Sequence, residues 1–86
     1  MKIRLENGEE AEAKAIEGNL LTFLSPRAFA PGSPVSFAAT TDSGARSFEG
    51  RAIGSKRADD AHFEVRMRFV NLRRGDRDFL AGRFGN

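Results

Sequence analysis

The clearest pattern in the chain is the alternation of apolar and polar side chains over residues 62–70, HFEVRMRFV. The apolar positions are Phe63, Val65, Met67 and Phe69, and the intervening polar positions are His62, Glu64, Arg66 and Arg68. A period of two is typical of a β-strand that buries one face and exposes the other. The pattern therefore predicts a strand whose arginines face solvent.

Weaker versions of the same alternation predict five further strands, separated by turn-forming residues. We expect these strands over residues 2–6, 9–17, 19–25, 35–39 and 45–55. The dipeptide Asn7-Gly8 is a strong hairpin signal between the first two. Residues 26–34 contain three prolines, which cannot donate to a strand ladder, and are expected to form a loop.

Two of these strands have positions that require a choice of register. Residues 9–17 favour strand if Ala11, Ala13 and Ala15 share one face and Glu12, Lys14 and Ile16 the other. In residues 45–55, Phe48 and Ile53 have opposite parity. A β-bulge at Gly50 would bring both to the same face, and we expect one there.

The C-terminal segment predicts a short helix. Asp76 is the expected N-terminal cap, and Phe79, Leu80 and Phe84 form the expected apolar stripe. Six short strands followed by one helix predict an all-β fold, a small antiparallel barrel whose helix covers one open end. Residues 1–86 are expected to form a single domain.

Composition narrows the function classes. The chain has no cysteine, one histidine and a formal net charge of +2, so thiolate metal sites and disulfide scaffolds are excluded. No apolar leader or membrane-length run is seen, and we expect a cytoplasmic protein without membrane insertion. His62 stands alone and Asp59-Asp60 falls in a turn, so the sequence predicts neither an enzyme, a metal site nor a cofactor.

The order of several motifs resembles that of the bacterial PilZ domain. The carriers of the resemblance are the stretch from Glu17 into an apolar strand, APGSPV at 30–35, GRAI at 50–53, RFVNL at 68–72 and RDFL at 77–80. Together they cover nearly all of the chain after about residue 10, and the resemblance implies the same barrel with a C-terminal helix. PilZ domains bind cyclic di-GMP, a bacterial second messenger, through an R-x-x-x-R motif and a D-x-S-x-x-G motif.

Both nucleotide-binding motifs are altered in this chain. No two arginines stand four residues apart before Glu17, and Glu17, Asn19 and Thr22 replace the Asp, Ser and Gly of the second motif. If that Gly has positive φ, Thr22 would be sterically strained there. We therefore expect an ordinary turn into a strand and little or no affinity for cyclic di-GMP.

The candidate partner-binding residues are Arg27, Phe29, Arg66 and Arg68. Phe29 lies in the proline-rich loop, where it either tucks under the barrel or faces a partner. Arg66 and Arg68 could bind phosphates or an acidic partner, or form a solvated face neutralised by Glu64 and cross-strand Glu49.

From the resemblance and the altered nucleotide-binding motifs we expect a non-enzymatic bacterial signalling or adaptor domain that binds another protein. The resemblance implies a link to type IV pili and surface motility. One alternative is cyclic di-GMP binding by other contacts, using Arg4, Arg27 or Arg51. A second is a basic barrel that binds nucleic acid, which the absence of Tyr and Trp disfavours.

Overall fold

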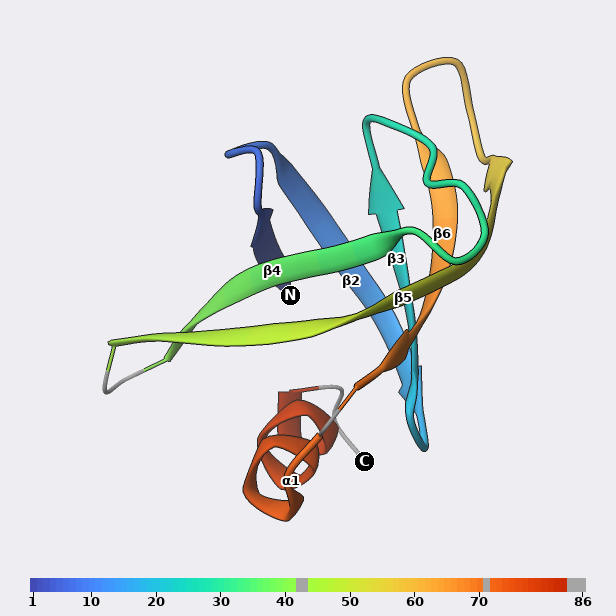
Figure 1. The fold of residues 1–86 in the computed structure, drawn as a ribbon. Coiled ribbons are helices and arrows are strands. Elements are labelled where there is room, and N and C mark those ends of the chain that lie inside the picture. The colour runs from blue at the N-terminus through green and yellow to red at the C-terminus, as the bar shows by residue number, and fades with distance from the viewer. Residues whose placement is uncertain (42–43, 71, 84–86) are drawn as a thin grey trace.

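A computed structural model of the chain describes residues 1–41, 44–70 and 72–83. The described residues form six strands and one helix (Figure 1). The elements are β1 (Lys2–Leu5), β2 (Glu10–Glu17), β3 (Leu20–Ser25), β4 (Pro34–Thr41), β5 (Gly44–Arg57), β6 (Phe63–Phe69) and α1 (Arg74–Arg83). The segment 9–17, whose Ala, Glu and Lys content also favours helix, is a strand as predicted.

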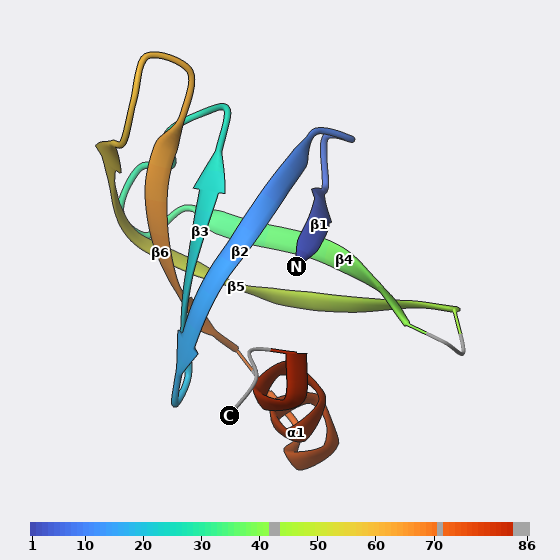
Figure 2. The same cartoon turned by 180° about the vertical axis from the view of Figure 1, so that it is seen from behind.

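The strands close into one antiparallel barrel in the order β1-β2-β3-β6-β5-β4, with β4 returning to β1. Figures 1 and 2 show β4 and β5 running across β2, β3 and β6 as a long hairpin that projects to one side. The predicted all-β barrel with a C-terminal helix is therefore confirmed. Within the described ranges, no helix is long and apolar enough to span a membrane.

The inward side chains of the strands form one apolar core that contains Phe23, Phe37, Phe48 and Phe69. The rings of Phe37 and Phe48 stack at 5.3 Å, and Phe69 packs against both at 6.1 Å. The predicted face of β6 is inward, with Val65 and Met67 fully buried. Aromatic pairs at these separations add to the stabilisation that burial supplies.

The irregular positions of the barrel differ from the expected ones. On β5 the register shifts between Ala52 and Gly54, so the bulge predicted at Gly50 is wrong. The shift leaves Ile53 outside the barrel with 42% of its surface exposed. Gly50 is instead a point of close approach, since a Cβ there would overlap the carbonyl oxygen of Arg68.

A second shift, on β2, lies between Ala13 and Ala15. Ala13 is buried, but Ala15 is exposed and Ile16 packs on the core. The predicted alternation in this strand therefore holds only up to the shift. A bulge of this kind reverses which face the following residues take.

The helix packs beside the end of the barrel where β6 ends (Figures 1 and 2). Leu80 has no exposed surface and joins the core, and Phe79 stacks on Phe48 at 6.3 Å. The helix begins at Arg74, so Asp76 lies within its first turn and the predicted cap is wrong. An acidic side chain still suits that turn, because the N-terminal end of a helix dipole is positive. Phe84, like Asn71 of the 68–72 motif, lies outside the described residues.

Candidate functional site

The turn that joins β2 to β3 carries two of the predicted ligand-binding positions, Glu17 and Asn19. Gly18 supplies the positive φ of this turn, at 62°. The backbone carbonyl of Asn19 accepts from the Phe69 N–H at 2.9 Å, and its Oδ1 accepts from Arg77 Nη2 at 3.1 Å. Asn19 therefore ties the turn to the end of β6 and to the helix.

Thr22, the third predicted position, lies inside β3 rather than at a bend. It pairs with Ala15 on β2 and with Arg66 on β6. The conditional argument that Thr22 would be strained at a positive-φ position does not apply, because Gly18 makes the turn and Thr22 is a regular strand residue. This is the ordinary turn into a strand that we expected. The steric argument against a nucleotide at Thr22 loses its basis.

Three arginines gather on the outer surface of β5 and β6, and we call Arg51, Arg66 and Arg68 the arginine face. Arg68 lies directly opposite Arg51 in the β5–β6 pairing. Arg66 is two residues before Arg68 on the same side of β6. All three side chains are exposed. The sequence prediction found two of these three, and missed Arg51 as their neighbour.

The predicted neutralisation of the arginine face is not found in the described part of the chain. Glu49 pairs with Ser36 on β4, and the nearest cation to Glu64 is Lys56, with Nζ 3.8 Å from Oε1. Within the same residues no carboxylate forms an ion pair with Arg66 or Arg68. Arg51 Nη1 donates to the Gly32 carbonyl at 3.0 Å, which leaves its charge without a carboxylate.

Apolar side chains border the arginine face. Leu20 lies opposite Arg68 on β3, and Leu24 lies opposite Glu64. Both are only partly buried, and Ile53 projects from the bulge on the β5 side. The outer surface of β3, β6 and β5 therefore combines cationic groups with apolar ones, a composition that suits contact with another macromolecule.

The other two predicted partner-binding residues lie elsewhere. Arg27 Nε is 2.8 Å from Glu9 Oε1, in an exposed ion pair. Phe29 tucks under the barrel, where its ring packs edge-on against Phe23 at 6.0 Å. Ser55 holds the loop in place, because its hydroxyl accepts from the Phe29 N–H at 2.8 Å and donates to the Phe29 carbonyl at 2.9 Å. Arg27 and Phe29 line a separate hollow of about 300 Å³.

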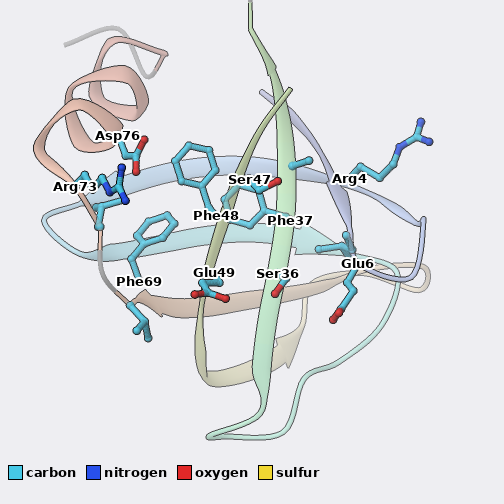
Figure 3. A pocket seen from close by; sticks show the side chains of 14 residues that line it. Arg4, Glu6, Ser36, Phe37, Ser47, Phe48, Glu49, Phe69, Arg73 and Asp76 are labelled. Atoms are coloured by element: carbon cyan, nitrogen blue, oxygen red, sulfur yellow. The ribbon is translucent and has the colours of Figure 1, made fainter. Parts of the chain in front are cut away.

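A larger groove, of about 840 Å³, is lined by residues of β1, β4 and β5, of the end of β6 and of the start of the helix (Figure 3). Its lining includes the small side chains of Ser36, Ala38 and Ser47. These positions alternate with Phe37 and Phe48, which also line the groove (Figure 3). Small side chains on two adjacent strands leave space between larger neighbours. The small residues that alternate with phenylalanines are visible in the sequence, but the sequence analysis did not predict a groove there.

The groove carries charges of both signs. Arg4 and Glu6 lie on the β1 side, and Glu49, Arg73 and Asp76 lie toward the helix (Figure 3). Two of these groups already have partners within the fold. Asp76 Oδ1 is 3.2 Å from the Arg46 Nη1, and Arg4 is 3.9 Å from Glu10. The groove thus has no single sign of charge, in contrast to the arginine face.

The single histidine forms a local contact in the β5–β6 turn. Its Nδ1 lies 3.0 Å from Asp59 Oδ1, and both side chains are exposed. The Ala61 N–H, followed by His62, hydrogen bonds to the Asp59 carboxylate and lowers its pKa below the usual range. Among the residues that the structure describes, no group of three or more acidic or histidine side chains is arranged to hold a metal.

Comparisons with known proteins identify no relative of the chain. No family model, no curated protein and no solved structure matches the chain. The site is therefore characterised by its own geometry. Its main features are the exposed arginine face, which forms no ion pair with the described carboxylates, and the mixed-charge groove.

Proposed function

We propose that this chain is a non-enzymatic adaptor domain that binds another protein through the arginine face. The observation that supports this most directly is the position of Arg51 opposite Arg68. Like charges directly opposite each other in a sheet are destabilising. A partner that supplies carboxylates would offset this cost, and would explain why two cations face one another on an exposed surface.

The resemblance to PilZ domains supports a role in bacterial signalling. It also suggests regulation of type IV pili or surface motility as the process in which such an adaptor acts. The altered Glu17, Asn19 and Thr22 positions and the lack of an arginine pair before them favour protein binding over binding of the usual nucleotide.

A second candidate function is cyclic di-GMP binding by contacts that differ from those of the family. It is favoured by one observation: arginines from distant segments lie beside the altered motif, with Arg77 bonded to Asn19 and Arg66 opposite Thr22. A guanidinium can stack on a base and donate to a phosphate. Of the arginines considered for this role, Arg4 lines the large groove, Arg27 lines the small hollow and Arg51 lies on the arginine face.

The first test is capture of a partner from a lysate of the source cell with the purified chain as bait. We expect a protein that is retained by the unaltered chain and by Arg4→Glu, but lost with the double variant Arg66→Glu/Arg68→Glu. Equal retention by all three baits would contradict binding through this face. Calorimetric titration with cyclic di-GMP tests the second candidate, and low-micromolar affinity would replace the first proposal with it.

A further inference from the structure

We infer that the arginine face recognises an acidic, extended segment of the partner protein, in which two carboxylates are separated by one residue. This inference rests on the proposed function and specifies the chemistry of its partner. It follows from the spacing of the three guanidinium groups and from the apolar side chains around them.

The spacing matches an extended peptide. Arg66 and Arg68 stand two residues apart on one strand, which places their Cα atoms roughly 6.6–6.8 Å apart. An extended ligand repeats its own side chains on one face at the same interval, so Glu-x-Glu can present one carboxylate to each arginine. Arg51, opposite Arg68, provides a second guanidinium for the same carboxylate, in a charge-assisted contact.

The borders of the face define the rest of the segment. Continuing along β6 from Arg68 through Arg66, the next outward residue is Glu64, which lies opposite Leu24. A third carboxylate in the ligand would be repelled there, whereas a leucine would contact Leu24. The pattern expected in the partner is therefore Glu-x-Glu-x-Leu, with the leucine beside Leu24 and the first glutamate beside Leu20 and Arg68.

The same features favour a protein over a nucleic acid. Among the described residues of the face no aromatic side chain is exposed for base stacking, which sequence-tolerant binding of single strands commonly uses. The chain has a net charge of only +2. A phosphate backbone carries a charge at every step and would be repelled by Glu64, whereas the expected peptide places a leucine there.

The probe for this inference is a fluorescein-labelled peptide with the repeat Glu-Thr-Glu-Thr-Leu, titrated with the whole chain and followed by fluorescence anisotropy at low salt. We expect saturable binding that weakens by roughly tenfold or more in Arg68→Glu, the loss expected for one buried charge-assisted contact. Arg66→Glu is expected to act in the same way. A peptide with Gln in place of Glu is the ligand control, and we expect it not to bind.

Arg4→Glu is the matched protein control, since it makes the same charge change at an exposed position on β1, beside the large groove. We expect it to bind the acidic peptide as the unaltered chain does. If Arg4→Glu weakens binding as much as Arg68→Glu, the site is the groove or a general charge effect, and the inference fails. Tighter binding of a single-stranded oligonucleotide than of the peptide at the same salt would also overturn it.

The outcomes separate this inference from the proposed function. Capture of a bacterial protein that depends on Arg66 and Arg68, together with no binding of the acidic peptide, would leave the adaptor function and overturn the acidic segment. If neither the partner capture nor the peptide titration gives the expected result, both the adaptor function and the acidic segment are overturned. Circular dichroism of each variant confirms that it is folded before its affinity is compared.

Discussion

Asn19, in the turn between β2 and β3, accepts a hydrogen bond on its Oδ1 from Nη2 of Arg77 in the C-terminal helix. The two residues are 58 positions apart in the sequence. Asn19, which the sequence offered as a candidate ligand-binding position, therefore has a structural role. The side-chain carbonyl that a ligand would have to reach is already used by the fold.

The Asn19–Arg77 bond is expected to contribute modestly to stability, because both groups are exposed. Asn19→Ala and Arg77→Ala should each lower the free energy of unfolding by about 0.5–1 kcal/mol. The double variant should lose less than the sum of the two, which urea denaturation of all four proteins measures. Strictly additive losses would mean that the bond contributes nothing in solution.

Replacing Gly50 by alanine is expected to be severely destabilising. The new Cβ would overlap the Arg68 carbonyl oxygen and lie 2.6 Å from Met67 Cε. Since a backbone atom cannot yield as a flexible side chain does, we expect a loss of about 3 kcal/mol or more. Gly54→Ala is the matched control on the same strand, where nothing lies within 4 Å of the added atom. Similar thermal midpoints for the two variants would contradict this close packing.

Leu80 is expected to be the main anchor of the helix on the barrel. Its side chain is fully buried, so Leu80→Ala should cost about 2–5 kcal/mol. Ile53→Ala removes the same number of carbon atoms from a side chain that is 42% exposed, and it should change stability by about 0.5 kcal/mol or less. A small effect of Leu80→Ala in denaturant titrations would show that the helix packs weakly in solution.

Replacing Arg68 is expected to weaken binding of the partner but to stabilise the fold, because Arg68 lies opposite Arg51. Arg68→Gln should raise the free energy of unfolding by a few tenths of a kcal/mol at low salt, because it relieves cross-strand repulsion. The gain should shrink at about 1 M salt, where such charges are screened. A destabilised Arg68→Gln would indicate that an unseen interaction holds the arginine. If the gain is found, weak binding by Arg68 variants cannot be ascribed to unfolding.

Asp59 is expected to give the turn before β6 a small dependence on pH. Its pKa in the folded chain lies below the usual value, first because the Ala61 N–H bonds to the carboxylate and then because His62 does. A lowered folded pKa contributes stability above the unfolded pKa, and this contribution is lost as the pH falls through the folded pKa. Between ~pH 5 and ~pH 2 the unaltered chain should therefore lose slightly more stability than Asp59→Asn. Parallel pH profiles of the two in urea titrations would argue against the shift.

The barrel could be predicted from the sequence because its signal is local. In β6 and β4 alternate residues differ sharply in polarity, and each strand lies between recognisable turns. The bulges were missed or misplaced for a physical reason. Whether Ile53 or Gly50 leaves the regular register depends on β6, the strand that pairs with them, which the local pattern does not contain.

The candidate site was predicted only in part for the same reason. Arg66 and Arg68 stand out within one strand, whereas Arg51 becomes their neighbour only through the pairing of β5 with β6. The ordinary turn into a strand expected around Glu17, Asn19 and Thr22 needed only local residues, because Gly18 makes the turn and Thr22 follows within β3. Long-range pairing thus decided which arginine was missed.

The join between β1 and β4, which closes the barrel, has few paired residues. β1 pairs with β4 at Arg4–Ala38 and Leu5–Phe37, whereas β4 pairs with β5 from Pro34 to Thr41. The large groove spans this join, because Arg4 of β1 and Ala38 of β4 both line it. A molecule bound in the groove would contact both strands across the join that has the fewest paired residues, so its binding would stabilise the closed barrel.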